Sequence, residues 1–257
     1  MQQADNGEAL LPSQGGFRAF FAREGKAVLA LSAATIVVEL GAYGLARAAG
    51  GGAISAALGA LAAACVWVVL ACPLAAAGGK DGWGSVLRGG IIADSSAVLL
   101  IVLCLTAWDG EGRRVVAFLA AVKIYFVYAA VSLAAAAAVC CGKTRATRRV
   151  LALVSAVVLF TLLATPFWTV GLLECLSGPA RDQAAAWAVL WNPFYSVTSA
   201  VAERTGFVWH YGSVMYRITR IGQDVIPPPV AWYSAVWRYG LLAGLFGAVA
   251  LRRRLGR

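Results

Sequence analysis

The sequence predicts an all-α integral membrane protein with six transmembrane helices, a short interfacial helix before them and a helical outer loop between spans five and six. Hydrophobic residues make up 61% of the 257 residues and charged residues only 13%, whereas about a quarter of a soluble domain is charged. The apolar residues are gathered into six runs, each long enough to cross about 30 Å of hydrocarbon as a helix. The basic residues cluster mainly at the ends of these runs.

The first 26 residues differ from the rest of the chain. Residues 1–16 form a polar, glycine-rich lead. Residues 17–26, FRAFFAREGK, place three phenylalanines on one helical face beside three basic side chains. This combination is typical of a helix that lies in the membrane interface. Residues 1–26 are therefore predicted to be a polar lead followed by an interfacial helix.

The remainder, residues 27–257, is predicted to be one six-span membrane domain. Each apolar run is expected to be a helix, because a helix satisfies its own backbone hydrogen bonds where no water is present. Alanine is abundant in these runs, and small side chains let membrane helices approach closely. GLLAG at 240–244 is a GxxxG pattern and indicates a helix contact face. The predicted spans are about 27–46, 53–76, 90–108, 115–141, 150–173 and 231–251.

Lysine and arginine are unevenly distributed between the short loops. With the N-terminus inside, the inner segments include KTRATRR at 143–149 and RRRLGR at 252–257, while the two short outer loops hold only Arg47, Arg113 and Arg114. Because cytoplasmic loops are enriched in Lys and Arg, we expect both termini in the cytoplasm and the protein in a bacterial plasma (inner) membrane. The net charge of +10 is thus assigned to contacts with the lipid bilayer, and no nucleic-acid motif accompanies it.

The segment between the last two spans, residues 174–230, is too rich in aromatic residues to be a simple polar linker. ARDQAAAWAVLW at 180–191 has apolar residues at helical spacing. Asn192 is a natural N-cap and Pro193 a natural first residue of the next helix. PPP at 227–229 stops any helix before the last span. Amphipathic helices packed at the outer interface are therefore expected here.

Residues 207–217, FVWHYGSVMYR, contain the single histidine of the chain. A metal or haem site would need several converging ligands, and the other candidate ligands are scattered along the sequence. The segment is interpreted instead as part of an outer interfacial loop, in which rings and basic side chains reach the headgroup layer. The residues assigned to that role here are Trp209, His210, Tyr211, Arg217 and Arg220.

Motifs of nucleotide-binding and hydrolytic enzymes do not occur in the sequence. GKT at 142–144 resembles the end of a phosphate-binding loop, but that loop needs a glycine where this chain has Ala137, inside an apolar run. No GxSxG, HExxH or GxGxxG pattern is present. The chain is therefore expected to be no enzyme and to hold no catalytic, cofactor-binding or metal-binding residue.

Three ionisable residues, Glu39, Asp94 and Lys123, fall inside predicted spans. A charge in hydrocarbon costs at least a few kcal/mol, so such residues face the bundle interior and usually pair. At about 1.5 Å per residue, Glu39 and Lys123 reach similar depths from opposite ends of their spans, which predicts an ion pair. The pair would be either a salt bridge between helices or part of a substrate or proton path.

The order of these elements, together with WNPFYSV at 191–197, resembles the permease subunit of ABC-2-type transporters. In that family the outer loop before the last span forms short helices and often opens with an Asn-Pro-aromatic segment. The resemblance implies a separate ATP-binding subunit, a homodimer, and export or flipping of an amphipathic substrate. The family usually has a longer ATPase-docking helix between spans two and three, whereas this chain has GGKDGWGSVLRGG at 78–90. Trp83 in this segment is the candidate for docking the ATPase.

Two other functions stay open at this point. One is a non-transport scaffold or assembly subunit whose outer helical loop docks another protein. The other is a membrane-embedded enzyme that acts on lipids through His210. A permease needs an ATP-binding partner, an enzyme needs further polar residues converging on His210, and a scaffold needs neither.

Overall fold

The computed structural model describes residues 14–79, 81–107, 111–205 and 231–255, and all regular structure in these residues is helical. Six of the described helices are long and apolar enough to cross a membrane, which confirms the predicted all-α membrane fold. They are α1 (Gln14–Ala48), α2 (Ala53–Ala77), α3 (Gly82–Ala107), α4 (Glu111–Cys140), α5 (Arg145–Leu163) and α10 (Trp232–Leu255). Three shorter helices lie between α5 and α10: α6 (Thr165–Glu174), α7 (Gly178–Leu190) and α8 (Pro193–Thr205).

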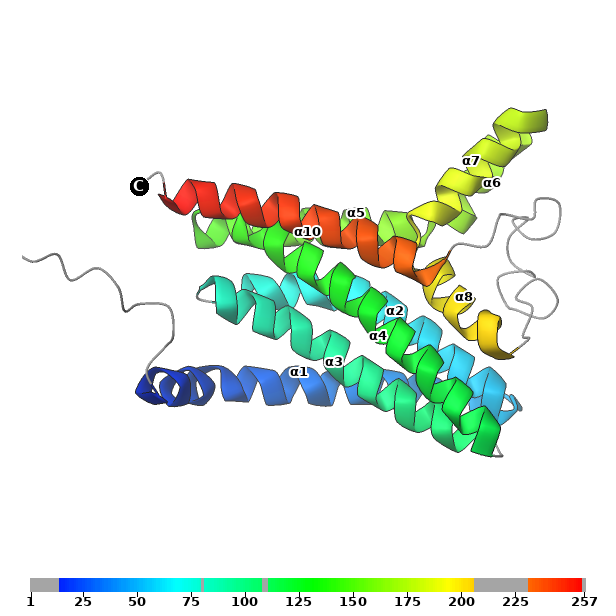
Figure 1. Cartoon of the computed structure of the whole chain (residues 1–257), viewed down its shortest axis with the longest axis horizontal. Helices are drawn as coiled ribbons and strands as arrows, with labels where there is room; N and C mark the ends of the chain where they lie inside the picture. The colour runs from blue at the N-terminus through cyan, green and yellow to red at the C-terminus, as the bar shows by residue number, and fades with distance from the viewer. Residues whose placement is uncertain (1–13, 80, 108–110, 206–230, 256–257) are drawn as a thin grey trace, which may run out of the picture.

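The six long helices run up and down through one bundle (Figure 1). The start of α1, the α2–α3 turn, the α4–α5 turn and the end of α10 lie at one end, called the basic end because of its lysines and arginines. Helices α6, α7 and α8 lie at the opposite end, where α6 and α7 form a hairpin that projects from the bundle. The loops predicted to be cytoplasmic therefore share one end of the molecule.

Helices α2 and α4 form the centre of the bundle. In their most apolar windows 56% of the residues are buried, against 11% for α1 and 17% for α5 and α10, which are peripheral. The core is built largely from alanine and valine side chains such as Ala60, Ala64 and Val68 of α2, and its largest buried residues are Tyr128 of α4 and Tyr239 of α10. Small side chains on facing helices let the backbones approach, as expected from the alanine-rich runs.

Predicted boundaries in α1 and α5 differ from the structure. The interfacial segment 17–26 is not separate, because α1 continues through it without a break. The fifth predicted span, 150–173, is wrong in its second half: α5 ends at Leu163 and a new helix, α6, begins at Thr165. Pro166 explains this break, since proline has no N–H with which to continue the backbone hydrogen bonds of α5.

The turn between the second and third spans is shorter than predicted. The third span was expected to begin near residue 90, but α3 begins at Gly82, so only residues 78–81 connect it to α2. Trp83 therefore lies in the first turn of a helix rather than in a loop. This placement fixes the backbone of Trp83 at the basic end.

Candidate functional site

The basic end contains a buried ion pair that joins two spans distant in sequence. Arg88 of α3 donates from Nε to Glu24 Oε2 of α1 over 2.6 Å, and the Glu24 side chain is almost completely buried. Sequence reasoning missed this pair because Glu24 was assigned to an interfacial helix. The available signal was a single acidic residue among the bases of FRAFFAREGK.

The α2–α3 turn beside this ion pair is held from both sides. Asp81 accepts a 2.6 Å hydrogen bond from the Gly84 N–H, which caps the start of α3. Arg148 of α5 donates from Nη1 to the Gly79 carbonyl over 3.1 Å. Gly79 itself is required by close packing, because a Cβ there would overlap the backbone of Ser85. The turn is therefore fixed relative to α1, α3 and α5.

Trp83 lies in the first turn of α3, next to this α2–α3 connection, with 80% of its surface exposed. The predicted docking residue is thus outside the core and within two residues of Asp81. Two environments suit such a side chain: a protein partner, because tryptophans often dominate interfaces, or the headgroup layer, where tryptophans also collect. In both cases the residue lies where the bundle meets its surroundings at the basic end.

At the opposite end, Asn192 connects three helices. Its Nδ2 donates to the Leu163 carbonyl over 2.9 Å and to Thr165 Oγ1 over 3.1 Å, while Oδ1 accepts from the Phe194 N–H over 2.9 Å. The last bond is the predicted cap, and α8 begins at Pro193 as expected. The bonds to the end of α5 and the start of α6 could not be read from the sequence. They explain why this asparagine is completely buried.

The neighbouring Trp191 attaches this joint to the last span. Tyr239 of α10 donates its hydroxyl hydrogen to the Trp191 carbonyl over 2.7 Å. The guanidinium of Arg238 lies over the Trp191 ring, 5.6 Å from its centroid. The segment WNPFYSV is therefore the point at which the outer helices are joined to both α5 and α10.

The predicted pair between Glu39 and Lys123 does not form. Glu39 is completely buried, and neither of its carboxylate oxygens has a hydrogen-bond partner among the described residues. Lys123 of α4 instead lies over the ring of Trp232, 5.8 Å from its centroid. Similar depths along the two spans do not bring Glu39 and Lys123 together, because α1 packs against α2 and α3, not against the face of α4 that carries Lys123.

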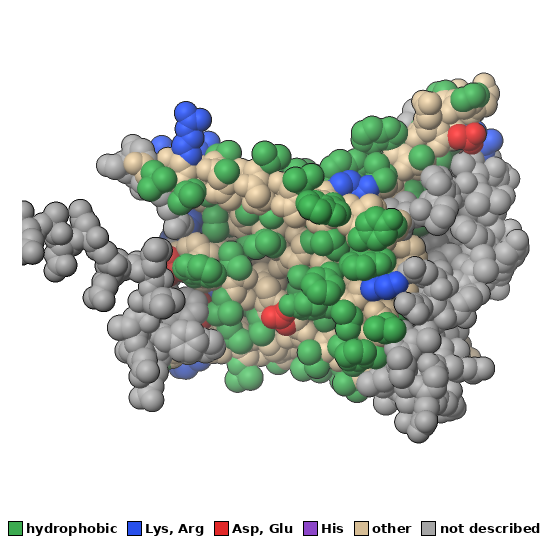
Figure 2. All heavy atoms as spheres, in the orientation of Figure 1, with side chains coloured by type: hydrophobic (Ala, Val, Ile, Leu, Met, Phe, Trp, Pro, Cys, Tyr) green, Lys and Arg blue, Asp and Glu red, His purple; other side chains and the backbone are tan. Residues whose placement is uncertain are grey.

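Asp94, the third intramembrane candidate, is exposed rather than directed into the core. It lies on α3 beside Tyr125 of α4. Figure 2 shows that the visible face of the bundle is mainly apolar, with an acidic side chain in its middle and basic side chains towards both ends. The structure thus brings none of the three charged candidates together.

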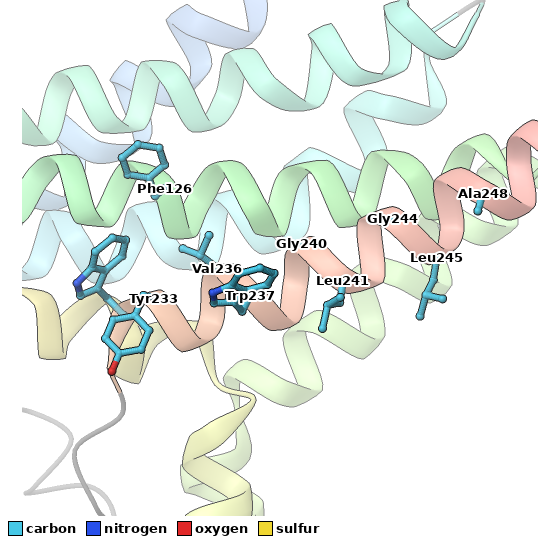
Figure 3. A pocket seen from close by; sticks show the side chains of 10 residues that line it. Phe126, Tyr233, Val236, Trp237, Gly240, Leu241, Gly244, Leu245 and Ala248 are labelled. Carbon is cyan, nitrogen blue, oxygen red and sulfur yellow. The ribbon is translucent and has the colours of Figure 1, made fainter.

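An apolar groove of about 670 Å³ follows α10 on its outer face (Figure 3). Its volume is that of a small-molecule pocket, but its lining offers no charged or amide side chain to orient a polar ligand. Gly240 and Gly244 of the predicted GxxxG pattern lie in it, and a Cβ on either would meet no atom within 4 Å. The groove is lined chiefly by Phe126, Trp232, Trp237, Gly240, Gly244 and Ala248.

The outer interfacial residues Trp209, His210, Tyr211, Arg217 and Arg220 lie outside the described residues. Within the described ranges, no three His, Cys, Asp or Glu side chains are grouped to hold a metal ion. Comparison with known protein families, curated proteins and solved structures finds no match to this chain.

Proposed function

We propose that this protein is the membrane-spanning permease subunit of an ATP-driven exporter or flippase, and that it docks a separate ATP-binding protein through Trp83. The observation that carries the proposal is a tryptophan with 80% of its surface exposed in the first turn of α3, next to a connection held by neighbouring helices. A partner that binds where the backbone is already fixed loses little conformational entropy in ordering it. A large aromatic side chain in that position suits the centre of an interface.

Three further features support a permease. The chain has no phosphate-binding loop, so ATP-driven transport would require a second protein. The α2–α3, α4–α5 and C-terminal segments meet at the basic end, which the Lys and Arg bias assigns to the cytoplasm, where ATP is available. Three short helices lie between α5 and α10, where the resemblance implies short outer helices.

The docking proposal can be tested by purifying the protein in mild detergent from its native host and identifying co-purified proteins. Wild type should retain an ATP-binding protein, and Trp83→Ala should release it without lowering the thermal stability of the membrane protein. Trp187→Ala is the matched control, because Trp187 is 64% exposed but lies on α7 at the opposite end. Equal retention by Trp83→Ala and wild type would exclude docking through this residue.

A second copy of the chain is proposed to pack in the groove on α10. Closely spaced glycines let two membrane helices approach, and an identical groove on the partner would be self-complementary under two-fold symmetry. In a background without native cysteines, Gly240→Cys should form oxidatively cross-linked dimers in membranes. Val157→Cys on α5, also exposed, should not. Equal cross-linking from both positions would indicate random collisions and contradict this dimer.

The competing function is a scaffold without transport. The projecting α6–α7 hairpin, with Trp187 exposed on it, is the feature that favours this alternative. A scaffold would lose its partner on Trp187→Ala and keep it on Trp83→Ala. The purification experiment therefore distinguishes the two functions: a permease loses its partner on Trp83→Ala, and a scaffold loses its partner on Trp187→Ala. The third alternative, a lipid-acting enzyme, depends on His210, which lies outside the described residues.

A further inference from the structure

Glu39 is the buried acidic group that the docking and dimer proposals leave unexplained. Its side chain has no accessible surface, and both carboxylate oxygens lack a hydrogen-bond partner among the described residues. The hydroxyl of Ser96 on α3 lies beside this carboxyl group and is also completely buried, but the two groups do not meet the distance and angle of a hydrogen bond. Two unsatisfied polar groups thus meet between α1 and α3, within the apolar part of the bundle.

No cation on the packed helices neutralises Glu39. Helix α1 packs against α2 and α3. The sequence of α2 contains no Asp, Glu, Lys or Arg. The two charged residues of α3 are Arg88, which pairs with Glu24 at the basic end, and Asp94, which is itself acidic and is exposed.

The other titratable groups near Glu39 are neutral in the protein interior. Tyr128 of α4 is completely buried, and its hydroxyl donates to the Leu61 carbonyl over 3.3 Å. Cys65 of α2 is a buried free thiol next to that tyrosine. On α1 itself, Arg47 donates to the Gly51 carbonyl beyond the end of the helix. An ionised Glu39 would therefore be an uncompensated charge in a low-dielectric environment.

We propose that Glu39 is an intramembrane proton-binding site, occupied at neutral pH, in which the protonated carboxyl donates its hydrogen to Ser96 Oγ. Protonation removes the uncompensated charge, and the Ser96 hydroxyl oxygen can accept the added hydrogen. The proton is the ligand that fits, because the described residues hold no group of three His, Cys, Asp or Glu side chains that could bind a metal ion. In this exchange the Glu39 carboxylate takes up one proton from water and later releases that proton back to water.

Polar side chains lie on one face of α1 between this site and the basic end. Ser95 donates to Ser32 over 3.0 Å, so the two hydroxyls pair across the α1–α3 interface. One helical turn before Glu39, Thr35 accepts a 2.9 Å hydrogen bond from Trp67 Nε1. Together with Glu24, these α1 residues recur at spacings of three, four and eight, which places them on one face of the helix. These side chains make this face of α1 partly polar within a largely apolar bundle.

Infrared spectroscopy of the purified full-length protein in lipid can detect the bound proton directly. The difference between wild type and Glu39→Gln at neutral pH should contain the carbonyl band of one protonated carboxyl group. Ser96→Ala should shift this band to higher frequency, because the carboxyl loses its hydrogen-bond acceptor. Ser95→Ala is the matched control: it removes the neighbouring hydroxyl and should leave the band in place.

Two results would overturn the proposal. One is a difference spectrum with only the bands of an ionised carboxylate, which would mean that Glu39 has a cationic partner. The other is a protonated band that Ser96→Ala does not move. Folding is not in question, since Glu39→Gln replaces one neutral group by another of similar shape and should keep the wild-type thermal stability. The proposal does not depend on Trp83, so partner release and the infrared band can succeed or fail separately.

Discussion

Glu24 and Arg88 lie 64 positions apart in sequence and are joined by a 2.6 Å hydrogen-bonded ion pair at the basic end. The two partners differ in environment, because the Glu24 side chain is 1% exposed and the Arg88 side chain 22%. Removing either partner therefore has a different consequence. Loss of the arginine takes a cationic partner from an almost completely buried carboxylate, whereas loss of the glutamate leaves a guanidinium that can reach water.

We expect Arg88→Ala to lower thermal stability in detergent more than Glu24→Ala. Breaking a buried pair costs about 3–5 kcal/mol, and the glutamate variant should fall below that range because Arg88 is partly exposed. Arg145→Ala, an exposed arginine at the start of α5, is the control and should have little effect. Equal destabilisation by both variants would mean that the difference in burial between Glu24 and Arg88 does not determine the loss of stability.

The two glycines Gly79 and Gly90 provide a matched test of close packing. A Cβ at Gly79 would overlap the backbone of Ser85, so Gly79→Ala should destabilise the protein by about 1–3 kcal/mol. A Cβ at Gly90 meets nothing within 4 Å, and this residue lies inside α3. Gly90→Ala should therefore be neutral or stabilise by up to about 1 kcal/mol through helix propensity. Thermal unfolding of both variants checks the sign of each change.

Asn192→Ala should loosen the outer helices from the bundle. The change removes the cap of α8 and leaves the Thr165 hydroxyl without one of its partners, at a cost of about 1–2 kcal/mol for the cap alone. Limited proteolysis should then cut between α5 and α8 earlier than in wild type. Ser177→Ala is the control, because Ser177 precedes α7 as its N-cap without a side-chain bond to that helix. Faster cutting in both variants would contradict a specific role for Asn192.

The orientation in the membrane can be read from a native cysteine. Cys175 is exposed between α6 and α7, at the end opposite the C-terminus. A variant that keeps only Cys175 should react with a membrane-impermeant maleimide on intact cells, since the Lys and Arg bias assigns that end to the outside. A cysteine added after Arg257 should react only after permeabilisation. The reverse pattern would invert the topology and remove the basic end from the compartment that holds ATP.

The elements that the sequence predicted correctly depend on local information. Six spans follow from the lengths of apolar runs, and the α8 cap follows from the adjacent pair Asn192–Pro193. The break before α6 also had a local signal in Pro166, which an unbroken apolar run concealed. Interactions between helices were harder to predict. Depth along a span gives one coordinate, but the Glu39–Lys123 prediction also needed to know which helices are neighbours, and that depends on packing of the whole bundle.

The shortness of α5 has a consequence for the lipid around the protein. Its 19 residues extend about 28 Å, while the 30 residues of α4 extend about 45 Å. Helix α4 can adapt to a thin bilayer by tilting, and Figure 1 shows it crossing the bundle obliquely. Helix α5 has no spare length, because arginines stand at its start and the Asn192 joint closes its end. In a thick bilayer the hydrophobic length of α5 is shorter than the hydrocarbon core. The lipid next to α5 must then thin locally, so α5 is the part of the protein on which a change in membrane thickness acts.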